Sequence, residues 1–305
     1  MTVWLPYPDW PDLIDLPSGL PVAVYDGSGY PPPGLDDVDF FVLPYLAGTG
    51  PARLMAQMPA LRVAQTLTAG VDDVRPLVPA GVTLCNARGV HDASTAELAV
   101  ALVLASLRGL PDHVLAGERG EWAHDTRPSL ADRRVLIVGY GAVGAAVEAR
   151  LAGFECEVRR VARHARSEPV PVEPFASLPA LLPWAEVVVL TVPMTDETRG
   201  LVDAGFLAAL PDGALVVNVA RGPVVVTDDL VAEVRTGRLL AALDVTDPEP
   251  LPPEHPLWSC PGVLVSPHVG GDTTAFLPRA RRLVEAQLRR YVAGEPLANV
   301  ITDAY

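Results

Sequence analysis

The sequence contains no lysine: all 23 of its basic residues are arginine, against 37 acidic residues. The resulting net charge of −14 argues against a non-specific nucleic-acid binder, because such proteins carry an excess of positive charge. An acidic exterior can still hold a local basic pocket for an anion. In this chain any such pocket must use guanidinium groups, which favour bidentate contacts with carboxylates and phosphates.

Cysteine and long apolar runs are also scarce. Cys85, Cys156 and Cys260 lie far apart and have neither metal-ligand nor redox spacing, which predicts free thiols in a reducing compartment and no metal site. The longest apolar stretch, residues 98–105, is far below the roughly 20 residues that a membrane span needs. The first ten residues lack the basic start and apolar core of a signal peptide. We therefore expect a soluble, cytoplasmic protein.

The most informative motif is RVLIVGYGAVG at residues 134–144, an apolar run that leads directly into three glycines. Gly139 permits a tight turn from strand to helix, Gly141 lets the backbone approach a pyrophosphate, and Gly144 allows close packing of the helix on the strand. The N-terminus of the following helix attracts the negative phosphates. Because a strand pattern precedes the glycines and a helical pattern follows them, the motif predicts a dinucleotide site rather than an isolated turn.

Two α/β patterns follow one another along the chain, and 305 residues is a typical length for two domains. The first pattern predicts a small parallel sheet with strands at residues 22–25, 38–43, 61–67 and 82–84. The second predicts a doubly wound sheet of six strands at residues 135–138, 157–161, 186–191, 214–219, 239–245 and 263–265. We predict an α/β fold with a Rossmann dinucleotide-binding domain at 96–270. A smaller flavodoxin-like substrate domain is predicted at 1–95, to which a C-terminal helix within 271–305 returns.

Several helix ends are marked by capping residues. Ser94 is followed three residues later by a glutamate, so this capping box predicts that Ser94 caps a helix ending at Leu107, which joins the domains. Thr227 and the two aspartates after it predict the start of a later helix, and Gly237 lies just past its end. Residues 279–292 predict an arginine-rich amphipathic helix.

Sequence blocks around the glycine motif resemble those of the D-isomer-specific 2-hydroxyacid dehydrogenases and occur in the same order. These blocks are TLTAGVD at 66–72, VPMTDETR at 192–199, NVARGP at 218–223, ALDVTDPEP at 242–250 and SPHVG at 266–270. The resemblance implies a two-domain fold with the active site in the cleft between the domains. It also implies a homodimer that pairs through residues 108–122, with Trp122 reaching the neighbouring subunit's cleft.

The same resemblance implies that Arg221, Glu249 and His268 are catalytic. Reduction of a 2-oxoacid sends a hydride from the nicotinamide to the carbonyl carbon, so the developing alkoxide needs a proton donor, and an imidazolium suits that task. A carboxylate beside the histidine favours the charged ring and fixes its orientation, which is the role expected of Glu249. A guanidinium can hold the substrate carboxylate and carbonyl oxygen, which is the role expected of Arg221.

Further substrate and cofactor residues follow from the resemblance. The backbone N–H groups of Ala69, Gly70 and Val71 are expected to form a second cradle for the substrate carboxylate, and Tyr45 to help select the substrate side chain. Residues expected to contact the cofactor are Gly139, Tyr140, Gly141, Ala142, Val143, Gly144, Ala162, Arg163, Arg166, Val192, Pro193, Thr198, Val219, Ala220, Asp244 and Gly270. The other histidines, expected on surfaces or in loops, are His91, His113, His124, His164 and His255.

The choice of cofactor depends on the end of the second Rossmann strand. NAD sites place an acidic residue there to bind the ribose 2′-hydroxyl, whereas NADP sites have a neutral residue and a nearby arginine. Here the position is Ala162, followed by Arg163 and Arg166. The missing carboxylate removes repulsion against a 2′-phosphate, and either arginine can pair with it. The sequence therefore predicts NADP as the preferred cofactor, with NAD possible; the alternative is a solvated basic loop.

The predicted function is reduction of a small 2-oxoacid, of the glyoxylate or hydroxypyruvate type, to the D-2-hydroxyacid. Two alternatives stay open on sequence alone. One is a dehydrogenase acting on formate or phosphite, although the formate enzymes carry glutamine where this chain has Glu249. The other is a nucleotide-sensing, corepressor-like interaction module on the same fold, which a turnover assay would separate from an enzyme.

Overall fold

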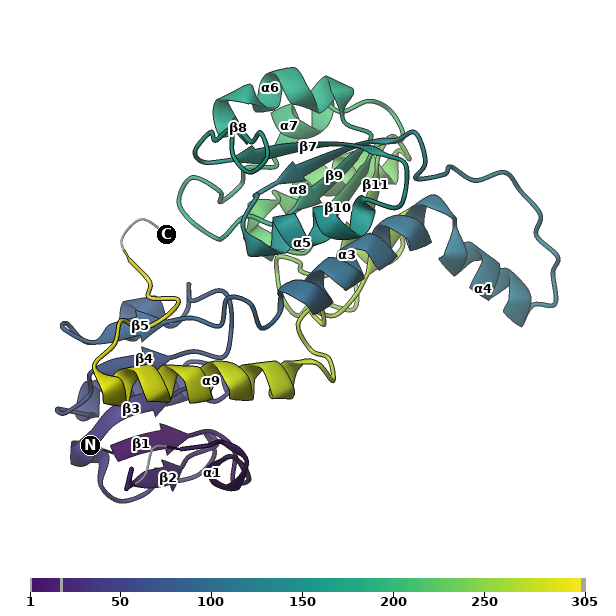
Figure 1. The fold of residues 1–305 in the computed structure, drawn as a ribbon. Coiled ribbons are helices and arrows are strands. Elements are labelled where there is room, and N and C mark those ends of the chain that lie inside the picture. The colour runs from purple at the N-terminus through teal and green to yellow at the C-terminus, as the bar shows by residue number, and fades with distance from the viewer. Residues whose placement is uncertain (1, 17–18, 303–305) are drawn as a thin grey trace. The chain divides into compact units, whose positions relative to one another are not determined.

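The computed structural model describes residues 2–16 and 19–302, and the chain divides into two compact units (Figure 1). The first unit combines residues up to 91 with those from 274 onward, and the second unit is residues 92–273. The boundaries expected from the sequence are 95/96 and 270/271. The first unit is thus built from both ends of the chain, and the second is one continuous segment.

The first unit is built around a five-stranded parallel sheet. Its strands are β1 (Thr2–Leu5), β2 (Val22–Val24), β3 (Val38–Val42), β4 (Val63–Gln65) and β5 (Thr83–Cys85), and its α-helices are α1 (Trp10–Leu13), α2 (Gly50–Arg53) and α9 (Phe276–Ala293). The strand order β2-β1-β3-β4-β5 is that of flavodoxin-like folds, as predicted. Phe40 and Phe41 belong to two separate cores, because successive residues of a strand point to opposite faces. The core that contains Phe40 also contains the buried face of α9.

The second unit is built around a seven-stranded parallel sheet. Its strands are β6 (Arg134–Val138), β7 (Glu157–Ala162), β8 (Glu173–Pro174), β9 (Val187–Leu190), β10 (Leu215–Asn218), β11 (Leu240–Leu243) and β12 (Val263–Val265). Its α-helices are α3 (Asp92–Leu107), α4 (Leu110–Glu118), α5 (Ala142–Leu151), α6 (Leu178–Leu181), α7 (Ala204–Ala208) and α8 (Thr227–Arg235). The order β12-β11-β10-β9-β6-β7-β8 contains the Rossmann order, read from β8, with β12 added at the far edge.

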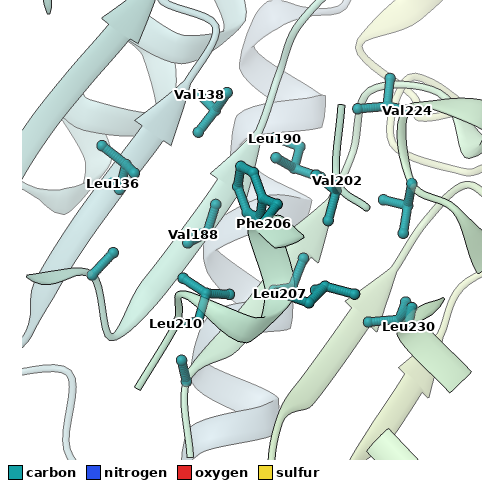
Figure 2. Packing of buried hydrophobic residues seen from close by; sticks show 14 of the residues in the cluster. Leu136, Val138, Val188, Leu190, Val202, Phe206, Leu207, Leu210, Val224 and Leu230 are labelled. Atoms are coloured by element: carbon teal, nitrogen blue, oxygen red, sulfur yellow. The ribbon is translucent and has the colours of Figure 1, made fainter. Parts of the chain in front are cut away.

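Apolar side chains cover both faces of this second sheet. One face packs against α6, α7 and α8, and Figure 2 shows Phe206 and Leu207 of α7 lying over Val188 and Leu190. The other face packs against α3 and α5 through the alternate strand residues, among them Ile137 and Val189. Burial on both faces explains why the strands β6, β9, β10 and β11 are nearly continuous apolar runs in the sequence.

Two strands were not predicted. β1 is four residues long and ends before Pro6, so it shows too little pattern to be recognised, yet it pairs with both β2 and β3. β8 has only two residues, and its Pro174 cannot donate a ladder hydrogen bond, which suits its position at the sheet edge. The predictions of four strands in the first sheet and six in the second are therefore each wrong by one.

The predicted helix ends agree with the structure in part. The prediction that Ser94 caps the helix is wrong, because α3 already begins at Asp92. The Ser94 hydroxyl instead makes a 2.8 Å hydrogen bond with the hydroxyl of Thr273. α3 ends at Leu107 and α8 begins at Thr227, as predicted, and Gly237 adopts a positive φ of 74° just beyond α8.

Seven short 3-10 helices complete the described chain: Leu35–Asp37, Leu54–Gln57, Arg75–Leu77, Phe175–Ser177, Leu182–Trp184, Gly222–Val224 and Pro256–Trp258.

Two expectations from composition concern membranes and thiols. Within residues 2–16 and 19–302, no single helix has the length and apolar composition to cross a membrane; α3 and α4 meet that test only as a pair bent by 64°. Cys85, Cys156 and Cys260 are free thiols, as predicted. Burial raises the pKa of the Cys85 thiol to about 11, so this group stays protonated and unreactive near neutral pH.

Candidate active site

The three candidate catalytic residues follow the carboxyl ends of three adjacent strands. Arg221 comes after β10, Glu249 after β11 and His268 after β12. Ligands of open α/β sheets bind at this edge, where the strands end. The strand order therefore brings residues that are distant in sequence to one edge of the second unit.

His268 and Glu249 are in direct contact. The distance from His268 Nδ1 to Glu249 Oε1 is 2.6 Å, and the carboxylate accepts the hydrogen bond from Nδ1. This contact orients the ring and leaves Nε2 as the nitrogen that can exchange a proton with a ligand. Both side chains are just over two-fifths exposed, so a ligand can reach them.

The backbone around His268 is held by the buried carboxylate of Asp244. His268 adopts a positive φ of 54°, which is uncommon for a residue other than glycine, and its N–H donates to the Asp244 carbonyl over 2.8 Å. The Asp244 carboxylate, 3% exposed, accepts hydrogen bonds from the Ser266 hydroxyl at 2.6 Å and the N–H groups of Val269 and Gly270 at 3.0 and 2.9 Å. Asp244 and Gly270, predicted as cofactor residues, thus meet in one turn, and Ser266 is a supporting residue that the sequence did not indicate.

Hydroxyl groups fix the loop that carries Glu249. Thr246 donates its hydroxyl hydrogen to the carbonyl of Pro248 over 2.8 Å. Thr227, the first residue of α8, donates to the carbonyl of Asp247 over 2.7 Å. The loop is therefore tied to itself and to α8 immediately before Glu249, which limits the freedom of the carboxylate relative to the imidazole.

Arg221 is positioned from the end of β10. The side-chain amide of Asn218, which is 1% exposed, donates to the carbonyl of Arg221 and accepts from the N–H of Ala220, each over 3.0 Å. The Arg221 guanidinium donates to the Ala220 carbonyl over 2.8 Å. The next residue, Gly222, lies so close to the Thr246 carbonyl that a Cβ would overlap it. Asn218 was missed from sequence, although a polar residue ending a buried strand is the signal that could have indicated it.

The glycine motif has the backbone that its sequence predicts. Gly139 has a φ of 101°, and a Cβ there would lie 2.6 Å from the carbonyl carbon of Thr191. A Cβ on Gly144 would overlap the carbonyl oxygen of Gly139, so α5 packs closely on its strand. Gly141, the N-cap of α5, has no atom within 4 Å of the place of a Cβ. The turn is therefore closely packed at Gly139 and Gly144 and open at Gly141. Open backbone at the start of α5 fits the binding of a pyrophosphate there.

A polar network surrounds Tyr140, between the first two glycines. Its hydroxyl donates to Glu148, and Arg160 Nε donates to the same carboxylate over 2.6 Å. The hydrogen bonds from Arg160 hold the pKa of the Glu148 carboxyl below its usual value, while burial and the neighbouring Glu148 raise the pKa of Tyr140. Arg166 donates to the Tyr140 carbonyl and lies 5.2 Å from its ring centre. Arg166 thus lies against the glycine loop itself.

The other predicted cofactor arginine has an acidic partner. Arg163 follows Ala162, the last residue of β7, and its Nε donates to Glu197 Oε2 over 2.8 Å. Glu197 precedes Thr198, whose buried hydroxyl donates to the Pro193 carbonyl over 2.6 Å. Three further predicted cofactor residues are buried: Val192, Val219 and Ala220.

The predicted substrate residues Tyr45, Ala69, Gly70 and Val71 belong to the first unit. The carbonyls of Ala69 and Gly70 accept from the Asn86 amide and the Thr68 hydroxyl, both over 2.7 Å. Within the part of the chain that the structure describes, the N–H groups of Gly70 and Val71 find no acceptor. This loop therefore has its carbonyls occupied and N–H groups available for an anion.

His91 lies in the bend immediately before α3, in a loop as expected, but its side chain is buried. Its Nε2 makes a 2.7 Å hydrogen bond with the Leu67 carbonyl. Its ring also stacks with those of Tyr45 and Phe276, with centroids 5.6 and 5.2 Å away. These partners are distant in sequence, so the pattern around His91 gave no sign of them.

Comparison with known proteins decides the family. Residues 100–270, more than half of the chain, match the family described as D-isomer specific 2-hydroxyacid dehydrogenase, NAD binding domain. The chain belongs to the D-isomer-specific 2-hydroxyacid dehydrogenases. As a member it is an NAD(P)-dependent oxidoreductase, so the predicted enzyme class and cofactor class are confirmed.

Three similar proteins extend the family match over the whole chain. A glyoxylate reductase of Thermofilum pendens is 30% identical over 303 residues, covering 93% of this chain and 89% of the relative. A family member from Xanthobacter autotrophicus Py2, solved with NADPH and MES, is 31% identical with a TM-score of 0.83, covering 100% and 99%. An NADPH-dependent glyoxylate/hydroxypyruvate reductase of Sinorhizobium meliloti, solved with NADP and sulfate, is 27% identical with a TM-score of 0.85, covering 99% and 98%.

The close contact at Gly222 gives a test of the site's geometry. Gly222→Ala forces the Thr246 carbonyl to move, and with it the loop to Glu249, so the free energy of unfolding is expected to fall by about 1–3 kcal/mol. Displacement of a catalytic group by about 1 Å costs roughly 10²-fold in rate, so kcat/KM is expected to fall by about that factor. Gly153→Ala is the control, because its Cβ would meet no atom within 4 Å. A Gly222→Ala enzyme with the parent's kcat/KM would contradict the role of this contact.

Proposed function

We propose that this dehydrogenase reduces a small 2-oxoacid, of the glyoxylate or hydroxypyruvate type, to the D-2-hydroxyacid, with NADPH preferred and NADH accepted. The observation that carries the proposal is the 2.6 Å contact between His268 and Glu249 at the strand ends that also hold Arg221. Similar proteins named glyoxylate reductase and glyoxylate/hydroxypyruvate reductase support this substrate class.

The bound nicotinamide supplies the hydride, and the residues of this chain supply the proton and the charges. His268 donates the proton from Nε2 to the oxygen that becomes the hydroxyl. Glu249 accepts the hydrogen bond from Nδ1 and so keeps the ring in the orientation that directs Nε2 to the substrate. Arg221 holds the carboxylate and carbonyl oxygen of the substrate and stabilises the charge that develops on that oxygen. From the first unit, we assign the N–H groups of Ala69, Gly70 and Val71 to binding of the substrate carboxylate and Tyr45 to selection of the substrate side chain.

We assign cofactor binding, together with Arg221, Glu249 and His268, to the second unit, residues 92–273, and the other proposed substrate residues to the first unit. The open backbone at Gly141 and the N-terminus of α5 hold the pyrophosphate. At the end of β7, Ala162 leaves room for a 2′-phosphate, and the guanidinium groups of Arg163 and Arg166 offer charge-assisted hydrogen bonds to it. Within this second unit the preference for NADPH thus depends on the loop after β7.

A cytoplasmic homodimer is the third part of the proposal, with residues 108–122 at its interface. Figure 1 shows α4 and the segment after it projecting from the rest of the second unit. Leu110, Val114 and Leu115 of α4 are at least half exposed, and Trp122 is 95% exposed. A second copy of the chain would remove these apolar surfaces from water. The three free thiols fit a reducing compartment.

Replacing the proton donor tests the reaction itself. His268→Ala is expected to lower kcat/KM for the best 2-oxoacid by roughly 10²-fold or more, because a positioned proton donor contributes about 10² to 10⁴. Arg221→Ala is expected to raise KM steeply, since the substrate carboxylate loses its charged partner. The measurement is initial rates over a panel of 2-oxoacids, with His255→Ala as the control outside the site. Near-full activity in His268→Ala would remove it as the proton donor.

The contact between Glu249 and His268 can be tested by a change that keeps the size of the side chain. Glu249→Gln replaces the anionic acceptor of the Nδ1 hydrogen bond by a neutral amide, so the ring is less firmly oriented. Because a charge-assisted hydrogen bond contributes about 1.5–3 kcal/mol, kcat/KM is expected to fall by roughly 10- to 100-fold while the fold is kept. Initial rates and thermal unfolding of parent and variant check this, and an unchanged kcat/KM would exclude Glu249 from the mechanism.

The cofactor preference can be tested at the end of β7. Arg163→Ala is expected to cost NADPH roughly 10- to 100-fold in kcat/KM and to leave NADH nearly unchanged, because a charge-assisted contact contributes about 1.5–3 kcal/mol. Ala162→Asp adds an acceptor for the ribose and repels a 2′-phosphate, so the preference is expected to reverse. Arg235→Ala, an exposed arginine of α8, is the control. A parent enzyme that favours NADH would overturn the assignment.

A further inference from the structure

The ion pair between Arg163 and Glu197 lies beside the position proposed for the ribose of the cofactor, so any role for this pair rests on the proposed cofactor site. NAD-type Rossmann sites have a carboxylate at the end of the second strand, where this chain has Ala162. Glu197, from the loop after β9, brings a carboxylate within 2.8 Å of the Arg163 Nε, one residue beyond that strand end. A carboxylate from another loop thus contacts the arginine that follows the strand end.

We propose that Glu197 determines cofactor specificity by two opposite effects on the ribose 2′-position. With NADH, its carboxylate accepts the hydrogen bond of the 2′-hydroxyl, which is the role of the strand-end acid in NAD-type sites. With NADPH, the same carboxylate competes with the 2′-phosphate for Arg163 and repels it. The pair therefore lets one site take both cofactors, with neither bound as tightly as a dedicated site would bind it.

Hydrogen bonds hold the backbone of the two loops that carry Glu197 and Arg163. Glu197 is held by Thr198, whose hydroxyl donates to the Pro193 carbonyl and accepts the N–H of Thr195 over 2.8 Å. On the other side, the loop after Arg163 is closed by two hydrogen bonds between Arg166 and Val172. A carboxylate on a fixed loop can be aimed at one ligand atom, whereas one on a mobile loop cannot.

The pair is also accessible and weak enough to be opened by a ligand. The side chains of Arg163 and Glu197 are 34% and 59% exposed. Exposed ion pairs contribute little to stability, so a 2′-phosphate with two negative charges can replace the carboxylate on Arg163. The displaced Glu197 then remains near the phosphate as a like charge, which lowers the affinity for NADPH without preventing binding.

Direct binding measurements on Glu197→Gln test this proposal. The exchange keeps the size of the side chain and removes its charge. The Kd of NADPH is expected to fall about 3- to 10-fold and that of NADH to rise by a similar factor, because one ligand loses a repulsion and the other an anionic acceptor. Nucleotide fluorescence gives both values, and calorimetry with 2′,5′-ADP and 5′-ADP repeats them without a nicotinamide. Asp196→Asn is the matched control, since Asp196 is the exposed acid beside Glu197.

Opposite shifts for the two cofactors support the proposal. Shifts in the same direction, or shifts no larger than those of Asp196→Asn, overturn it. The failure of the proposed function is distinguishable, because these titrations contain no 2-oxoacid. A chain that binds both nucleotides as expected but reduces no 2-oxoacid loses only the proposed reaction. A chain in which Arg163→Ala leaves the Kd of NADPH unchanged loses the 2′-phosphate site on which the role of Glu197 depends.

Discussion

The buried carboxylate of Asp244 holds the turn that carries His268, the proposed proton donor. It gathers three hydrogen bonds from residues 266–270, so the chain reverses tightly after β12 and His268 is fixed in a left-handed conformation. Without these bonds the turn would have no compensation for its unusual backbone. The contact between His268 and Glu249 is therefore a consequence of a buried acid that need not touch the substrate.

The rest of the site depends on how closely adjacent strand ends pack. β10 and β11 pair in register from Leu215 with Leu240 to Asn218 with Leu243, so the loops that follow start at the same level. Gly222 then lies directly against the Thr246 backbone. Arg221 and the loop of Glu249 are thereby coupled through main-chain atoms, which are stiffer than side chains. Precision at this edge comes from backbone contact rather than from interactions among the charged groups.

Local patterns in the sequence predicted what is determined locally. The roles of Gly139 and Gly144 follow from strand, turn and helix within a dozen residues. The central strands of the second sheet are apolar because both of its faces are covered. The pairing of His268 with Glu249 spans 19 residues and came from family resemblance, since no periodicity links a loop glutamate with a histidine after the next strand. The resemblance thus supplied the candidate site, and the geometry supplied its supports, Asn218 and Ser266.

Features that the sequence did not predict share a physical cause: a side chain interacts with a residue that is distant in sequence instead of following its local pattern. Ser94 has the sequence of a helix cap, but its hydroxyl bonds Thr273, 179 residues away. His91 lies in a loop as expected, but the rings of Tyr45 and Phe276, which are distant in sequence, bury it. The pair of Arg163 and Glu197 is of the same kind, since neither residue predicts the other. β1 and β8 were missed for a different reason: they are too short to carry a pattern.

The discontinuous first unit sets an order of events during synthesis on the ribosome. Its core includes Phe276, Ala280, Val284 and Leu288 of α9, which are translated after the whole of the second unit. Domains fold as units while the chain emerges, with the N-terminal one usually first. Here the N-terminal unit cannot be completed first, because α9 covers part of its sheet and follows the whole second unit in the sequence. A chain truncated after residue 273 would therefore contain the whole second unit attached to a first unit that lacks α9.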